Sequence, residues 1–476
     1  MSQVQINQES DGLQGKLKQR HITMIAIAGV IGAGLFMGSG KGIADNGPST
    51  IISYLFAAAL VVIIMRMLGE MASVRLKTTG SFQAYAKEAL GPMFGYSIGW
   101  LYYFFWMYII ALEAYLGSEI VRTLLPNHPI PDPVVSLLLV VLLTLTNCFS
   151  VESFGEFEFW FACIKVTTIV VFLGLGVLIM LNVIPNIESP GFSNLINADN
   201  GGFMPNGIIS VLLGSLFIMF AFFGAEIGVI AVRESDNPKK AIHTVINSVV
   251  WRILIFYVGS IFLIACIIPM NDTASLFNPY AAIFDMAGIP YAGTIIQCVV
   301  LTSVLSCLNS ALYTNSRMLF TLAKDGNAPK FFLKLNKRGV PVRAVLASTS
   351  LAYVITIVRF LSSGDFDMFA FIANASGAIA LLVYLIVAVS QIVLRKRNPD
   401  LPYSIKVWGF PYLSYAVVGL MILTLGTMFF IPPELGSSRI EIICTLSLAA
   451  FIVITYLLGP GRKNRKQQQD LPKEAS

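Results

Sequence analysis

The stretch Ile27-Ala28-Gly29-Val30-Ile31-Gly32-Ala33-Gly34-Leu35-Phe36-Met37-Gly38-Ser39-Gly40 decides how this chain is interpreted, because it places five glycines inside an apolar run of membrane-spanning length. A glycine within a helix costs about 1 kcal/mol relative to alanine, since it loses the most backbone freedom. A broken helix in hydrocarbon also leaves backbone amides without hydrogen bonds. The stretch therefore predicts a membrane helix that is interrupted where a ligand binds.

Two interpretations of these glycines are open. The free amides at the start of a half-helix suit a carboxylate, through hydrogen bonds and the positive end of the helix dipole. Discontinuous helices of transporters hold anionic groups in this way. The alternative is close packing between helices through small residues. Packing alone accounts for Gly34 and Gly38 but not for Gly32 and Gly34 together, so we favour the binding site.

The composition is that of a membrane protein. Of the 476 residues, 56% are hydrophobic and 12% are charged, and the mean hydropathy is +0.75. Soluble domains carry about 25% charged residues. The six cysteines show no Cys-x-x-Cys spacing and the three histidines lie far apart, so neither disulfides, a metal site nor a cofactor is expected. The first apolar run has no small-residue cleavage site, so we expect no cleavable signal peptide.

Apolar runs predict twelve transmembrane helices, each about as long as a bilayer is thick. Their ranges are 22–44, 49–70, 96–123, 133–151, 157–183, 207–231, 251–270, 291–320, 343–361, 366–394, 410–431 and 440–459. Most of the 32 basic residues fall in alternate connectors and in both tails. Because the cytoplasmic connectors of membrane proteins carry an excess of Lys and Arg, both termini are predicted to be cytoplasmic. The net charge of +6 follows from this placement and does not indicate nucleic-acid binding.

The sixth predicted helix repeats the feature of the first. It reads Phe220-Ala221-Phe222-Phe223-Gly224-Ala225-Glu226-Ile227-Gly228, a glycine-interrupted span that also holds a carboxylate. Interrupted spans at matching positions in two sets of five helices indicate a transporter site built from inverted repeats. Glu226 is an ionisable group in the bilayer, where such residues are functional by default. The alternative is that its carboxylate bridges the unwound backbone.

Two further ionisable residues fall within predicted spans. Glu113 shares a helix face with Trp106, at helical spacing, and can contact substrate or make a structural hydrogen bond. Lys165 can exchange a proton or replace a cation. The eighth helix offers Ser306, Asn309 and Ser310, which can satisfy Lys165 or an ion, or can join helices without further function.

Several segments resemble bacterial amino-acid permeases of the amino acid–polyamine–organocation superfamily, from about Gly15 to Leu458. They are Ile27–Gly40, Met65–Met71, Gly80–Phe82, Gly99–Tyr102, Phe154–Phe161, Ile164–Val166 and Leu305–Tyr313. The segment Ala375–Tyr384 and the surroundings of Glu113 most resemble the γ-aminobutyrate permeases.

This resemblance implies an all-α membrane protein of twelve transmembrane helices, with two inverted five-helix repeats plus two peripheral helices. The parts are a cytoplasmic tail (1–21), the ten-helix core (22–394), the peripheral helices with their preceding loop (395–459) and a second tail (460–476). The resemblance also implies that the amides of Ala33 and Gly34 bind the substrate carboxylate and that Lys165 is a proton-responsive stand-in for sodium. It places the substrate ammonium near the carbonyls of Val30, Phe220 and Phe223.

The predicted substrate site comprises residues from both interrupted helices and from the third helix: Val30, Ile31, Gly32, Ala33, Gly34, Trp106, Glu113, Phe220, Phe223, Gly224 and Glu226. Lys165, with Glu226 as the second candidate, is predicted to couple transport to protons. No Walker motif, nucleophile elbow or His-Glu-x-x-His pattern occurs, so we expect neither an ATPase nor another enzyme.

The leading functional hypothesis is proton-coupled import of a small zwitterionic amino acid across the bacterial cytoplasmic membrane. The first candidate substrate is γ-aminobutyrate or a similar ω-amino acid. The alternatives are a permease for an α-amino acid, such as glycine, alanine, serine or an aromatic one, and an amino-acid sensor without transport. The expected partners are the amino acid, the proton and the lipid bilayer, with no nucleic acid. The sequence does not predict the oligomeric state.

Overall fold

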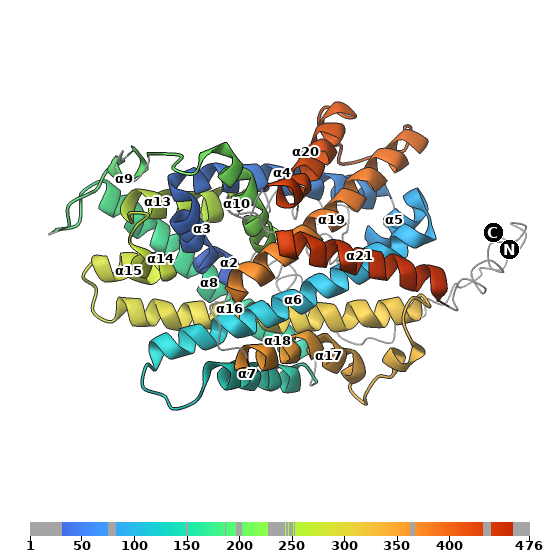
Figure 1. Ribbon diagram of the computed structural model, residues 1–476, viewed down its shortest axis with the longest axis horizontal. Helices are drawn as coiled ribbons and strands as arrows, with labels where there is room; N and C mark the ends of the chain where they lie inside the picture. Colours follow the sequence, from blue (N-terminus) through green and yellow to red (C-terminus); the bar gives the residue numbers. More distant parts are fainter. Residues whose placement is uncertain are drawn as a thin grey trace, which may run out of the picture.

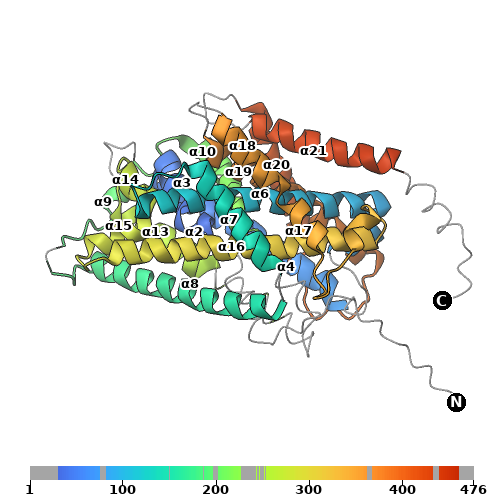
Figure 2. The ribbon, with the colours of Figure 1, turned by 90° about the horizontal axis from the view of Figure 1, so that it is seen from below.

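The computed structural model describes residues 31–74, 82–148, 151–185, 187–196, 202–226, 243, 246, 251, 253–361, 367–431 and 439–459, with the backbone alone for Ala33 and for residues 151–157. The described part is a bundle of helices, the longest of which run roughly along its long axis (Figures 1 and 2). These helices are α2 (Ala33–Phe36), α3 (Gly38–Asn46), α4 (Thr50–Val74), α5 (Phe82–Leu90), α6 (Pro92–Leu124), α7 (Asp132–Asn147), α8 (Val151–Met180), α9 (Ser193–Ile196), α10 (Gly207–Phe222), α13 (Gly259–Ile267), α14 (Thr273–Phe277), α15 (Pro279–Met286), α16 (Ala292–Lys324), α17 (Val342–Ser348), α18 (Ser350–Leu361), α19 (Met368–Arg397), α20 (Tyr412–Phe430) and α21 (Arg439–Leu458). Shorter turns are η1 (Gly47–Ser49), the π-helix η4 (Ile253–Val258) and η5 (Lys330–Leu333).

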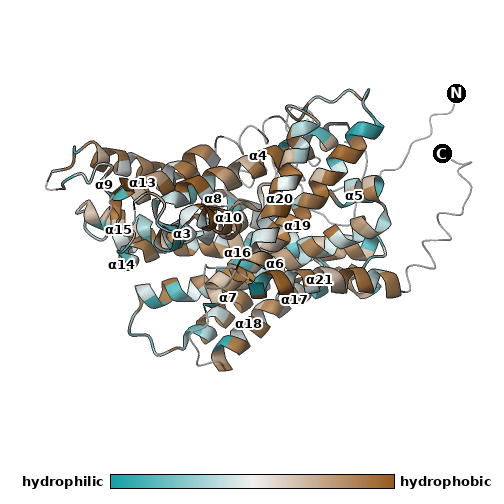
Figure 3. Cartoon of the chain, turned by 45° about the horizontal axis from the view of Figure 1, so that its top comes forward, coloured by the Kyte–Doolittle hydropathy of each residue, from teal (hydrophilic) through white to brown (hydrophobic). Residues whose placement is uncertain are grey.

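The described residues contain eight helical stretches that are long and apolar enough to cross a membrane. One of them, Gly34–Val74, runs through two of the predicted helices, and the shorter apolar helices are Asp132–Asn147, Gly207–Phe222 and Leu254–Ile267. Hydrophobic residues dominate the helices, and hydrophilic residues gather in the connections at the two ends of the bundle (Figure 3). The chain is therefore built as a multi-pass membrane protein. The count of twelve and the repeat arrangement stay predictions.

Several predicted helices agree closely with the observed ones, and others are subdivided. The range 96–123 corresponds to α6, and 366–394 corresponds to α19. The range 251–270 contains the π-helix Ile253–Val258, which is followed by α13, and 343–361 is divided at Thr349 into α17 and α18. The sequence did not predict α14 and α15, short helices whose first turns are capped by the side chains of Asp272 and Asn278.

Helices α6 and α16 are the centre of the bundle. Helix α6 packs against α16, α19, α5 and α7, while α16 also packs against α8 and α2. Helix α10 packs against α4, α19 and α2. The short helix α2 thus lies between α10 and α16, which is where the predicted site should form.

A buried carboxylate joins α4 to the far end of α19. Glu70 accepts hydrogen bonds from Gln391 Nε2 (2.9 Å) and from the backbone N–H of Val407 (2.6 Å), and its Oε1 lies 2.7 Å from Arg395 Nη1. The side chain of Glu70 is 1% exposed. A charge this deeply buried is tolerated only when it is paired and hydrogen-bonded, so this network fixes the loop after α19 against α4.

Candidate functional site

The structure describes the predicted first span from Ile31 onward, so its interruption before that residue stays a prediction. Ile31 and Gly32 precede the helix, α2 spans Ala33–Phe36, and a turn at Met37 leads into α3. The N–H of Leu35 donates to the carbonyl of Gly32 at 3.3 Å. The first amides of a helix have no partner within that helix, and binding of a ligand by those of Ala33 and Gly34 stays a prediction. Val30 lies outside the described residues.

The sixth predicted helix is also interrupted at its glycine. Helix α10 ends at Phe222, Phe223 is extended, and Gly224 has φ +103°, which glycine adopts without a steric penalty. The N–H of Gly224 donates to both carboxylate oxygens of Glu226 (3.0 and 3.1 Å), and Tyr384 Oη donates to Oε2 at 3.1 Å. Glu226 thus bridges the unwound backbone, as the structural interpretation expects. A contact with substrate or a proton stays a prediction.

The two breaks face each other. A Cβ atom added at Gly34 would lie 2.6 Å from Ala221 Cβ and 2.8 Å from Ala221 Cα, so the backbone of α2 rests directly on α10. Gly34 thus allows the close packing that the alternative interpretation expects, and it also lines a small cavity between α2 and α10. Ligand binding there stays a prediction. This central cavity of about 20 Å³ is lined by Gly32, Gly34, Phe105, Trp106, Ile109, Glu113, Phe220, Ala221, Phe223 and Cys307.

The central cavity brings together six of the predicted site residues: Gly32, Gly34, Trp106, Glu113, Phe220 and Phe223. Ile31, Gly224 and Glu226 are buried but are not among the residues that line it. Glu113 is 3% exposed, and its Oε1 lies only 2.6 Å from where a Cβ at Gly32 would be. A carboxylate and the start of a helix thus lie beside one small space.

A second polar cluster surrounds the buried Glu158, which is 4% exposed. Its carboxylate accepts hydrogen bonds from Ser306 Oγ (2.8 Å) and Asn309 Nδ2 (3.2 Å). Asn147 Nδ2 in turn donates to Asn309 Oδ1 at 2.6 Å. The polar face predicted on the eighth helix therefore binds a carboxylate of α8, and Ser310, 5% exposed, lies one turn further along α16.

Lys165 lies two helical turns beyond Glu158 on α8 and is 1% exposed. It interacts electrostatically with Glu158 and with Glu113, which lines the central cavity. Buried charges need compensation by nearby opposite charge. Lys165 therefore lies between the Glu158 cluster and the central cavity.

Comparison with known proteins identifies the family of this chain. Residues 21–469 match the family described as Amino acid permease. The γ-aminobutyric acid permease of Bacillus subtilis is 47% identical over 462 residues, which cover 96% of each chain. That of Escherichia coli is 45% identical over 93% of each chain. The aromatic amino acid transport protein of Corynebacterium glutamicum is 36% identical over 94% of this chain and 95% of its own. The chain belongs to the amino acid permease family.

Membership of the permease family confirms the predicted resemblance and gives the broad activity, which is transport of an amino acid across a membrane. The matched relatives are named as permeases, hence as transporters rather than enzymes. The multi-pass architecture of the described helices agrees with this assignment.

Sequence reasoning missed several residues that the permease places at the site. Phe105, Ala221 and Cys307 line the central cavity, and nothing in their residue types distinguishes them from other core positions. Glu158 could have been found, because a carboxylate seven residues before a buried lysine shares its helix face.

Proposed function

We propose that this permease imports a small zwitterionic ω-amino acid, with γ-aminobutyrate as the first candidate. The observation that carries the proposal is the central cavity, which brings the glycines at the start of α2 and the carboxylate of Glu113 together in one small space. The names of the relatives that are 45% and 47% identical support the same substrate.

The proposed binding mode follows the distribution of charge. The amides of Ala33 and Gly34 bind the carboxylate, which the helix dipole also favours. In an ω-amino acid the ammonium is separated from the carboxylate by extra methylenes, so a single helix break cannot hold both ends. Glu113 then receives the distal ammonium, and Trp106 and Phe223 contact the methylenes. Val30, Gly224 and Glu226 stay candidates for further contacts.

Binding requires movement. A cavity of about 20 Å³ holds roughly one water molecule, which is less than any amino acid needs. Admission of substrate therefore separates α2 from α10, whose contact at Gly34 and Ala221 has no spare room. Such alternating access is how transporters with a site at the bilayer midplane work.

We further propose proton coupling through Lys165, with Glu226 as the second candidate. Protonated Lys165 holds α8 near α2 and α16 while substrate is bound, and loss of its proton to the cytoplasm frees α2 to release substrate. A fixed positive charge repels Na⁺, so transport is independent of sodium. The placement of basic residues supports cytoplasmic termini in the bacterial cytoplasmic membrane.

The function is tested by uptake of labelled γ-aminobutyrate into proteoliposomes. We expect uptake driven by an inward proton gradient, unaffected by a sodium gradient, and inhibited by zwitterions but not by butylamine or butyrate. An α-amino acid permease is the second candidate, favoured by the relative that transports aromatic amino acids. Preferential uptake of alanine, glycine, serine or phenylalanine would replace the first candidate by the second. Binding without uptake of any of them would instead identify a sensor.

A further inference from the structure

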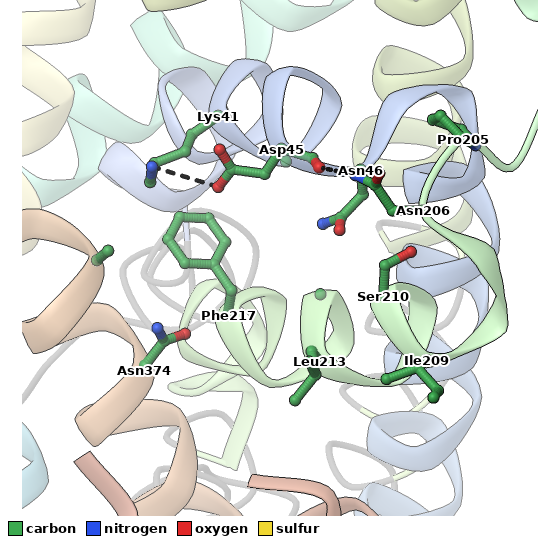
Figure 4. A pocket seen from close by; sticks show the side chains of 13 residues that line it. Lys41, Asp45, Asn46, Pro205, Asn206, Ile209, Ser210, Leu213, Phe217 and Asn374 are labelled. Atoms are coloured by element: carbon green, nitrogen blue, oxygen red, sulfur yellow. Dashed lines mark hydrogen bonds and ion pairs between the residues drawn. The ribbon is translucent and has the colours of Figure 1, made fainter. Parts of the chain in front are cut away.

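A second, larger cavity lies at the end of the bundle that carries α9, α14 and α15. This outer cavity has a volume of about 540 Å³ and is bounded by α3, α10 and α19, with Lys41, Asp45, Asn46, Asn206, Phe217 and Asn374 among its lining residues (Figure 4). The volume falls within the range of about 300–1,000 Å³ that small-molecule sites have. The outer cavity is therefore large enough for an amino acid, unlike the central one.

An aromatic layer separates the two cavities. Phe217 lines the outer cavity and Phe220 lines the central cavity, and their ring centroids are 5.5 Å apart. Phe369, from the start of α19, lies 5.5 Å from Phe217 and 6.5 Å from Phe220. A molecule that enters from this end reaches the outer cavity first, and it must pass this layer to reach the central cavity.

The outer cavity contains both signs of charge in one cluster. Lys41 Nζ lies 3.2 Å from Asp45 Oδ2 on the same helix and 3.1 Å from Asp367 Oδ2 at the start of α19. Figure 4 shows Lys41 and Asp45 facing each other on α3, with Phe217 beneath them and Asn374 opposite. The side chains are 26%, 53% and 55% exposed for Lys41, Asp45 and Asp367. Ion pairs as accessible as these are weak and exchange readily.

We infer that the outer cavity is a docking site for a zwitterionic amino acid on its way to the central cavity. The substrate carboxylate replaces an aspartate on Lys41, and the substrate ammonium pairs with the aspartate so released. Each ion pair lost is matched by one gained, so entry has little electrostatic cost. The inference rests on the proposed function, which supplies the class of ligand. Only a molecule with both charges can pair with Lys41 and with the released aspartate.

Docking also loosens the aromatic layer. Asp367 caps the first turn of α19, where its Oδ1 accepts from the N–H of Ala370 at 2.9 Å. Phe369 belongs to the same turn. The pair between Lys41 and Asp367 thus ties α3 to the segment that carries Phe369, and exchange of this pair for substrate releases that tie.

The experiment separates the two sites. Saturation-transfer NMR on the purified permease detects weak binding of γ-aminobutyrate, first in the wild type and then in Gly32→Ala, whose added methyl group occupies the central cavity. We expect a signal that persists in Gly32→Ala, falls about fivefold when Lys41→Met is added, and is retained with Lys41→Arg. Lys330→Met, which removes an exposed lysine of η5, is the matched control for net charge and should leave the signal unchanged.

A second measurement does not depend on the Gly32→Ala variant. In proteoliposomes, Lys41→Met should lower kcat/KM for γ-aminobutyrate about fivefold, and Lys41→Arg should restore it. Two results would overturn the docking site while leaving the proposed function intact. One is loss of the NMR signal in correctly folded Gly32→Ala. The other is an NMR signal and a kcat/KM that do not respond to Lys41→Met. A wild type that neither binds nor transports any amino acid would overturn both.

Discussion

Gly32→Ala is the most informative single change in the central cavity. The new Cβ atom would lie 2.6 Å from Glu113 Oε1 and 2.8 Å from Cys307 Sγ, both side-chain atoms, so the neighbours must move by several tenths of an ångström. Overpacking of this kind costs about 1–3 kcal/mol, which corresponds to roughly fivefold to 150-fold. Because the displaced atoms belong to side chains, the fold should survive and the loss should fall on substrate affinity.

The assay is equilibrium binding of labelled γ-aminobutyrate to the permease purified in detergent. Gly174→Ala is the matched control, since a Cβ added there on α8 meets nothing within 4 Å. We expect wild-type affinity in the control and weakening within the stated range in Gly32→Ala, with cooperative thermal unfolding retained in both variants. Wild-type affinity in Gly32→Ala would refute the assignment of this cavity to substrate.

Three other changes test separate parts of the account. Glu113→Gln keeps the side-chain size but removes the charge, so uptake of γ-aminobutyrate should fall by about 10-fold or more and uptake of alanine much less; equal losses would point to a purely structural Glu113. Lys165→Ala should abolish accumulation driven by a pH gradient but preserve binding, and continued pH-driven accumulation would exclude Lys165 as the coupling residue. Glu70→Ala leaves Arg395 without its buried carboxylate, so the free energy of unfolding should fall by about 3–5 kcal/mol. Thermal unfolding in detergent measures this loss, and an unchanged melting temperature would show that the network contributes little.

Much of the helical framework could be predicted from the sequence, because hydrocarbon imposes length and apolarity on every span. Helix α6, predicted at 96–123, is observed at Pro92–Leu124. The interruption at Gly224 was also predictable, since glycine is costly within a helix and this one lies in an otherwise apolar run. The division at Thr349 was not, because no glycine or proline marks it.

The candidate site could be predicted only in part. Glu113 and Trp106 share a helix face, so their joint position in the cavity follows from helical spacing. Cys307 and Ala221 enter the cavity because α16 and α10 converge on α2, and this convergence depends on tertiary packing. The role of Lys41 was hidden for the same reason, since its partner Asp367 is more than three hundred residues away in sequence.

The most direct test of the central claim is an experimental structure of the permease with γ-aminobutyrate bound. The account predicts density between α2, α6 and α10, with the carboxylate oxygens within hydrogen-bond distance of the amides of Ala33 and Gly34 and the ammonium beside Glu113. The α2–α10 contact at Gly34 should be wider than it is here. Substrate bound in the reverse orientation, or bound away from this cavity with the contact unchanged, would contradict the account.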